Sequence, residues 1–281
     1  MTMDLGNVQL RKPPELEPPH ARRSTTRLWV AVTLLVVAAA AAAYILFGRG
    51  DRELTTPPGA AGARNSAEPR IPLGGAPADI AVPPLDESDA LVRQLVAALS
   101  SHPRVAAWLA TDDLIRNFTA VVQDISAGMT PASRLQALAP GGSFRVVDRE
   151  GDLHIDTQSY ARYDSLADAI ASIDAAGAAS LYATLKPRIE EADDEQGFPH
   201  VPFDRTLERA IVRLLQTPVV SDTVAVEAQG AKVFAYADPQ LERLSAAQKH
   251  LLRMGPRNVR IIREKLREIA IALGIPETAL R

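Results

Sequence analysis

The sequence predicts a mainly helical protein with an N-terminal transmembrane helix, a flexible Pro/Ala/Gly-rich linker, and a helical domain that carries two small β-hairpins. Three observations lead to this prediction. Residues 28–47 carry no charge, residues 48–84 contain seven prolines and little that can be buried, and from residue 85 onward apolar residues recur at intervals of three and four.

The apolar run at residues 28–47 is long enough to cross a bilayer, because twenty helical residues span roughly 30 Å. Trp29 and Tyr44 lie near its two ends, where aromatic rings favour the membrane interface. A cleaved signal peptide is the alternative, but the run exceeds a signal-peptide core and resumes with apolar residues after six alanines. We therefore expect a retained anchor that contacts membrane lipid through residues 28–47.

The charges on either side of this run predict its orientation. Five basic residues precede it and only Arg49 and Arg52 follow closely, so the N-terminus is expected in the cytoplasm and the bulk of the chain outside. Residues 1–27 are charged and rich in proline, which is typical of a disordered tail. Residues 48–84 should form a flexible linker and residues 85–281 the folded domain.

The first part of the domain is expected to form three helices. Asp86 or Ser88 should cap the first helix, and a short second helix should bury Trp108. Asp112-Asp113 should begin the third helix, whose apolar residues share one face and which Gly128 should end.

The middle of the domain alternates between hairpin and helix patterns. Residues 144–156 should form a hairpin that turns at Glu150-Gly151, and a second hairpin should turn at Gln229-Gly230. Between them, Gly177 and Pro187 are expected to break or kink a long helical stretch, and Asp204 to cap the next helix.

Local start signals mark the last three helices. Asp238-Pro239 and Ser245 should each begin a short helix, Gly255 should end the second of these, and Pro256 should open the last one. The last helix carries a continuous apolar stripe that belongs in a core or an interface, formed by Val259, Ile262, Leu266, Ile269 and Leu273.

The last helix also carries six basic side chains between Arg253 and Arg267. A Gly-Pro turn before a helix N-terminus exposes free N–H groups, so an anion or partner-binding site is one hypothesis, with Arg253, Arg257, Asn258 and Arg260 as candidate residues. Its partner would be a lipid headgroup, an anionic envelope polymer or an envelope protein. The alternative is a solvated helix surface in which Gly255 and Pro256 only separate two helices.

A second candidate site lies in the segment "DTQSYARYD". Asp156, Tyr160, Tyr163 and Asp164 could bind a polar ligand or take part in acid–base chemistry. In the alternative reading the tyrosines cover the edge of a core and Asp164 or Ser165 caps the following helix. The acidic run "EEADDEQG", residues 190–197, is expected to be a solvated face, or a contact for a cation or a basic partner.

Composition and motifs exclude several chemistries. The chain has no cysteine and its five histidines are isolated, so no local zinc motif exists and no metal is predicted. We find no P-loop, no G-x-S-x-G and no dinucleotide fingerprint, and therefore predict no cofactor and assign no catalytic residue. A net charge of −3, the expected location outside the cytoplasm and a C-terminal helix without aromatic residues argue against nucleic-acid binding.

Four segments, "PPLDESDALVRQLVAALSSHP", "WLATDDLIRNF", "SYARYDSLADAIASIDAAGAASLYATLKP" and "LLRMGPRNVRIIREKLREIA", resemble an uncharacterised bacterial family that is found mainly in proteobacteria and catalogued as a domain of unknown function. The resemblance covers nearly all of residues 85–275. It implies a single-span envelope protein with a mostly helical outer domain, and it supplies no activity. Together with the predicted orientation, we expect a protein of the bacterial inner membrane whose domain is periplasmic.

These observations favour a binding or scaffolding module for a protein or an envelope component. The first alternative is an envelope hydrolase that uses a carboxylate pair such as Asp156 and Asp164. The second is a cytoplasmic regulatory domain, which would require the reverse topology.

Overall fold

The computed structural model describes residues 72–197, 201–230 and 233–280. The predicted tail, the predicted membrane span at residues 28–47 and most of the predicted linker lie outside these ranges. Across the described ranges, no helix combines the length and the apolar character that crossing a membrane demands.

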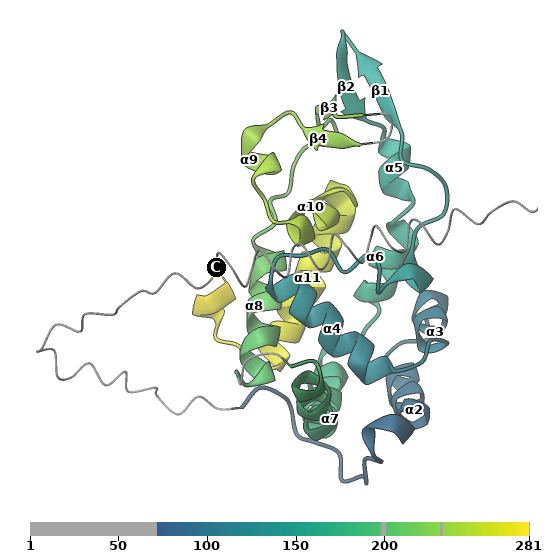
Figure 1. Cartoon of the computed structure of the whole chain (residues 1–281), viewed down its shortest axis with the longest axis vertical. Coiled ribbons are helices and arrows are strands. Elements are labelled where there is room, and N and C mark those ends of the chain that lie inside the picture. The colour runs from purple at the N-terminus through teal and green to yellow at the C-terminus, as the bar shows by residue number, and fades with distance from the viewer. Residues whose placement is uncertain (1–71, 198–200, 231–232, 281) are drawn as a thin grey trace, which may run out of the picture. The chain divides into compact units, whose positions relative to one another are not determined.

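The described part of the chain is mainly helical and carries two small antiparallel hairpins, which confirms the predicted fold class of the domain (Figure 1). Its elements in chain order, with η for short 3₁₀ helices, are η1 (Leu85–Glu87), α2 (Asp89–Leu99), α3 (Pro103–Leu109), α4 (Leu114–Ser126), η2 (Gln136–Leu138), β1 (Val146–Arg149), β2 (Asp152–Ile155), α5 (Thr157–Ala161), α6 (Asp164–Ala171), α7 (Ala175–Glu195), α8 (Phe203–Leu215), β3 (Val226–Ala228), β4 (Phe234–Tyr236), α9 (Pro239–Glu242), α10 (Ala246–Leu252), α11 (Pro256–Ala272) and η3 (Glu277–Leu280).

The main core lies between α4, α7, α8 and α11, with α2 and α3 at its edge (Figure 1). Phe203 at the start of α8 is fully buried, and its ring lies 5.9 Å from that of Phe118 on α4 and 6.5 Å from that of Tyr182 on α7. Burying an aromatic side chain in this way contributes about 1.5–3 kcal/mol, so Phe203 is a principal contact between the three helices.

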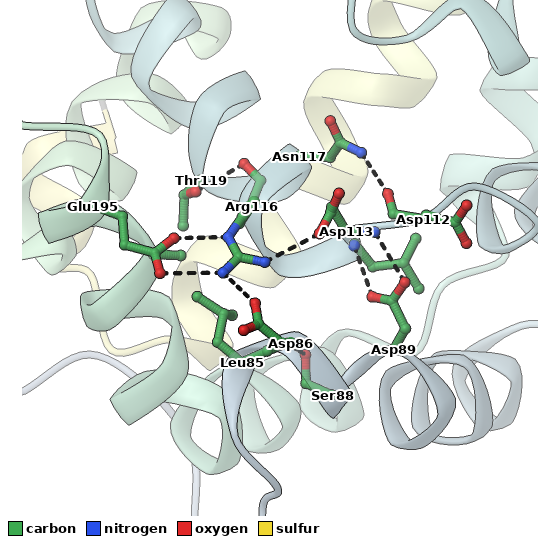
Figure 2. A network of polar contacts seen from close by, with 12 residues as sticks. Leu85, Asp86, Ser88, Asp89, Asp112, Asp113, Arg116, Asn117, Thr119 and Glu195 are labelled. Carbon is green, nitrogen blue, oxygen red and sulfur yellow. Dashed lines mark hydrogen bonds and ion pairs between the residues drawn. The ribbon is translucent and has the colours of Figure 1, made fainter.

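The N-terminus of α4 is capped by a residue of another helix (Figure 2). Helix α4 begins after Asp113, as predicted, but Asp113 has φ 56° and its side chain makes no capping hydrogen bond. Instead the carboxylate of Asp89 on α2 accepts the backbone N–H groups of Asp113 and Leu114, each at 2.9 Å. The prediction located the start of the helix correctly, and the acceptor comes from 24 residues upstream.

Arg116 ties the first turn of α4 to two neighbouring elements (Figure 2). Its guanidinium donates to Glu195 at the end of α7 at 2.7 Å, to Asp86 of η1 at 2.6 Å, and to Asp113 at 3.1 Å. These hydrogen bonds, that to Glu195 first, raise the pKa of Arg116 further above its ordinary value. The predicted acidic face at residues 190–197 is therefore partly engaged within the domain.

Helix α7 does not break where the sequence predicted. It starts at Ala175, because the carboxylate of Asp174 accepts the N–H groups of Ala176 and Gly177, and it continues through Pro187 to Glu195. The helical stretch is instead interrupted before Gly177, between the end of α6 at Ala171 and the start of α7 at Ala175. A proline within a helix costs about 3 kcal/mol, which burial of Leu185 and Ile189 on either side of Pro187 offsets.

Asp204 does not cap α8, which was the prediction. The N-cap position is Pro202, and the Asp204 carboxylate accepts from the Tyr182 hydroxyl at 2.6 Å, from Lys186 at 2.5 Å and from the backbone N–H of Leu73 at 3.2 Å. These three donors lie outside α8, so Asp204 joins α8 to α7 and to the segment before η1.

Residues 72–84, which composition assigned to the flexible linker, pack along α7. Gly74 N–H donates to Leu273 O, and Gly75 N–H donates to Ala179 O, both at 3.0 Å. The two glycines permit this approach, because a Cβ at Gly74 would lie 2.8 Å from the Cβ of Ala183. Residues 72–84 are therefore packed on the domain by hydrogen bonds of their backbone groups, which composition does not reveal.

Both hairpins form at the predicted turns. Glu150 and Gly151 adopt φ values of 59° and 95° at the β1–β2 turn, and β3 pairs with β4 across Gln229-Gly230. The hairpins are joined by a hydrogen bond from Ile155 N–H to Val224 O at 3.0 Å. Together they cover a second, smaller core with α10 (Figure 1).

The predicted starts of the last three helices are also confirmed. Asp238 caps α9, Ser245 forms a capping box with Gln248 at the start of α10, and Pro256 occupies the first turn of α11. The stripe of α11 faces inward, with Val259, Ile262 and Leu273 buried.

The cap on α4 yields the first prediction. Asp89→Ala removes the acceptor of two backbone N–H groups and should lower the free energy of unfolding by about 1–2 kcal/mol, measured by urea denaturation followed by circular dichroism. Asp112→Ala is the matched control, because Asp89 and Asp112 both pair with Arg93 but the Asp112 side chain is 92% exposed and accepts no N–H of α4. It should cost less than about 0.5 kcal/mol. Equal losses in the two variants would contradict the capping role.

Candidate functional site

The two polar segments singled out in the sequence lie against each other. The side-chain amide of Asn258, only 1% exposed, lies 2.9 Å from Asp164 Oδ1 and 3.1 Å from the carbonyl oxygen of Tyr160. Gly255 packs on the Tyr160 ring so closely that a Cβ there would lie 2.4 Å from Tyr160 Cγ. We call this contact between the start of α11 and the α5–α6 segment the junction.

The basic residues of the junction find partners within the domain. Arg257 donates to Asp168 at 2.9 Å and lies 3.5 Å from Asp164. Arg253 donates to the carbonyl oxygen of Phe234 at 3.0 Å and stacks 5.8 Å from the Tyr236 ring centre. Arg260 is exposed and has no hydrogen-bond or ion-pair partner among the described residues. The junction is therefore organised around internal contacts.

The remaining predicted site residues also have structural roles. Asp156 caps α5 by accepting Gln158 N–H at 2.9 Å. Tyr160 is buried, its hydroxyl has no partner among the described residues, and burial raises its pKa to about 12. Tyr163 packs edge-on against His250, whose burial lowers its pKa. The expectation that the tyrosines cover a core edge is confirmed, whereas Asp164 does not cap α6 because its carboxylate faces Asn258.

A large apolar hollow lies elsewhere, between the helices of the bundle. A cavity of about 340 Å³, which we call the central cavity, is lined by side chains of six helices, α2, α3, α4, α7, α8 and α11. Almost all of its lining is aliphatic or aromatic. Tyr182 and Trp108 are the two lining residues whose side chains carry a polar group, and the Tyr182 hydroxyl donates to Asp204 at 2.6 Å.

A second apolar cavity of about 140 Å³, the side cavity, adjoins the first between α2, α3, α6 and η2. Its lining includes Ser100 and Arg104, whose side chains make hydrogen bonds exposed to solvent. The two cavities share four lining residues, which form the wall between them: Val96, Leu99, Trp108 and Ile173.

The size of the central cavity sets it apart from a packing defect. Its volume of about 340 Å³ is more than twice the roughly 150 Å³ of an apolar cavity that binds benzene. Ligand pockets commonly measure about 300–1,000 Å³ and are lined mainly by apolar side chains, so the central cavity has the character of a binding site.

A third hollow, of about 600 Å³, follows the outer face of α8. Three arginines at intervals of four residues line it together with Glu208, namely Arg205, Arg209 and Arg213. Arg213 donates to the carbonyl oxygen of Ser126 and Arg209 to Thr206, so part of this charge is used within the domain. Within the described residues, no cluster of three or more His, Asp or Glu side chains could hold a metal ion.

A family model described as "Protein of unknown function (DUF3014)" matches residues 114–270, more than half of the chain. The chain belongs to this family. The match runs from the start of α4 to the end of α11 and so includes the junction and most of the cavity lining, while α2 and α3 precede it. The predicted membership of a family of unknown function is confirmed. No curated protein and no solved structure matches the chain.

The sequence predicted many cavity-lining residues as apolar, but it contained no signal for the cavity. Periodicity shows which side chains face inward and not how completely they fill the interior. The small residues Ala178 and Ala210, which line the central cavity among larger side chains, are the closest to such a signal.

The junction in the DUF3014 region yields the second prediction. Gly255 and Gly274 have φ values of 87° and 85°, but a Cβ at Gly274 would meet no atom within 4 Å. Gly274→Ala should therefore cost about 1–2 kcal/mol through backbone strain alone. Gly255→Ala should cost about 1–3 kcal/mol more, because the added methyl group strikes the Tyr160 ring. Thermal unfolding of both variants measures the difference, and equal shifts would refute the tight packing.

Proposed function

We propose that this chain is a membrane-anchored binding protein whose helical domain takes up an apolar component of the cell envelope. The single observation that carries this proposal is the central cavity of about 340 Å³ with its almost wholly apolar lining. In this proposal residues 28–47 span the bacterial inner membrane once, residues 1–27 lie in the cytoplasm and the domain lies in the periplasm.

The chemistry of the cavity favours binding over catalysis. General acid–base and nucleophilic mechanisms require polar groups that reach the substrate. In the central cavity, the hydroxyl of Tyr182 is already engaged, because it donates a hydrogen bond to Asp204. The carboxylates named for the hydrolase alternative serve elsewhere, Asp156 as a helix cap and Asp164 as a partner of Asn258. A ligand in the central cavity would be held by shape and by exclusion from water.

An apolar ligand also suits a protein attached to a membrane. Compounds with enough apolar surface to fill such a cavity partition into lipid, so a tethered domain meets them at high local concentration. A scaffolding role for an envelope protein remains the second candidate. The hollow along α8 favours it, because its arginines lie on an outer face.

The topology gives the third prediction. Because the natural chain has no cysteine, single cysteines introduced at Thr25 in the tail and at Ala132 on the domain surface can be labelled without background. A membrane-impermeant maleimide added to cells with a permeabilised outer membrane should label Ala132→Cys and spare Thr25→Cys until the inner membrane is lysed. The reverse pattern would place the domain in the cytoplasm and overturn the proposed location.

Filling the cavity gives the fourth prediction. Ala210 lines the central cavity, so Ala210→Leu should place three carbon atoms inside it and raise the free energy of unfolding by about 1–2 kcal/mol. It should also weaken binding of the neutral dye N-phenyl-1-naphthylamine, followed by dye fluorescence. Ala192 is equally buried but lines no described cavity, so Ala192→Leu should overpack the core and lower stability by about 1–3 kcal/mol. Loss of stability in both variants, with unchanged dye binding, would argue against an accessible cavity.

A further inference from the structure

We propose that the ligand is a single-chain anionic amphiphile whose hydrocarbon tail occupies the central cavity and whose anionic head lies beside Arg104. This inference rests on the proposed function and names the chemical class of its ligand. We infer the hydrocarbon tail from the volume and lining of the central cavity. We infer the anionic head from the residues that line the side cavity and its rim.

The volume of the central cavity matches one hydrocarbon chain. An apolar cavity of about 150 Å³ holds one benzene ring of six carbons, so by the same ratio 340 Å³ holds roughly fourteen carbons. A helical peptide is too large, because a helix about 10 Å wide and three turns long fills roughly 1,300 Å³. A lipid with two long chains exceeds the cavity about twofold on the same scale.

The side cavity provides the direction in which the head would lie. Four apolar side chains separate the two cavities, and Trp108 is the largest of them. Trp108 is half-buried on the short helix α3. A chain that passes this wall leaves its last carbons in the side cavity, next to Ser100 and Arg104.

Arg104 is a cation without a carboxylate partner among the described residues. The only hydrogen bond of its guanidinium among these residues, from Nη1 to the carbonyl oxygen of Ala139, is 3.4 Å long and exposed to solvent. By contrast Arg93, Arg116 and Arg134 each contact at least one carboxylate. The aliphatic stem of Arg104 lines the side cavity, so its guanidinium can stay in water while the stem covers a ligand.

The other polar groups at this rim do not compete for Arg104. Ser100 Oγ lies 2.7 Å from Ser172 Oγ and accepts the N–H of His102. The carboxylate of Asp174, two residues beyond Ser172, accepts the N–H groups of Ala176 and Gly177. A carboxylate or phosphate head would thus add a charge-assisted hydrogen bond that the domain itself does not supply to Arg104.

The test uses Trp108 as a reporter in the full chain. The sequence has two tryptophans, and Trp29→Phe leaves Trp108 as the only one. The chain is reconstituted in phosphatidylcholine nanodiscs and titrated with octadecanoate brominated at mid-chain, because roughly fourteen carbons fill the central cavity and the remaining ones can reach the side cavity beside Arg104. Bromine quenches a tryptophan that it contacts. We expect saturable quenching of Trp108. A brominated single-chain phosphate ester of equal length tests whether a phosphate head is accepted as well as a carboxylate head. A brominated two-chain lipid should quench Trp108 no more than it does from the surrounding bilayer.

The role of the head is tested by Arg104→Gln, with Arg260→Gln as the control at an exposed arginine without a described partner. We expect Arg104→Gln to weaken binding of the brominated acid about tenfold, while binding of its neutral methyl ester changes less than twofold in either variant. If acid and ester bind equally and Arg104→Gln has no effect, the assignment of the head falls but the apolar binding function stands. If no chain quenches Trp108 and Ala210→Leu changes no dye binding, both proposals fall.

Discussion

The domain has to hold six helices around an interior that their side chains do not fill. In a well-packed bundle the central contacts supply most of the stability, but here the middle of the bundle contains the central cavity. Contacts outside the cavity therefore add to the packing of the side chains in its walls. At one end of α4 these contacts are polar: Asp89 holds the first N–H groups, and Arg116 joins η1 and α7 (Figure 2). Gln123, two turns beyond Arg116 on α4, donates to the buried Asp193 at 2.6 Å and makes a second link between α4 and α7.

A second set of contacts joins α7 to α8 and to the segment before η1. Asp204 accepts hydrogen bonds from two side chains of α7 and from the N–H of Leu73. Gly74 and Gly75 let the segment before η1 pack closely against α7, where Gly75 N–H donates to Ala179 O. Because Tyr182 both lines the cavity and donates to Asp204, one side chain joins the apolar interior to this polar anchor. Burial and its contact with Asp204 raise the pKa of Tyr182 above its ordinary value, which keeps the hydroxyl neutral beside the cavity.

Sequence reasoning succeeded where a signal is complete within a few residues. The Glu150-Gly151 turn, the Ser245 capping box and the Gly255-Pro256 boundary each depend on neighbours within four positions. It failed where the partner is distant. Asp204 looked like a cap because its three donors, Tyr182, Lys186 and Leu73 N–H, lie between 18 and 131 residues away. Residues 72–84 looked like linker because glycine and proline composition does not reveal that Ala78 N–H bonds Thr184, 106 residues away.

The candidate sites divide in the same way. The two polar segments of the junction were each recognised by residue type, but their contact, across 94 residues between Asp164 and Asn258, could not be predicted from either segment. The cavity could not be predicted at all, because an unfilled volume depends on the shapes of side chains from six helices together.

Helix α11 shows how the two parts of the domain are connected. The first half of its apolar stripe, with Val259 and Ile262, packs against Tyr163 and Leu251 near the junction. The second half, with Leu266, Ile269 and Leu273, lines the central cavity. Its basic side chains lie on the remaining surface, where Arg257 pairs with α6 and Lys265 with Glu268. The charged surface of this helix is what remains exposed once both halves of its stripe face inward, and the proposed ligand site lies on its apolar side.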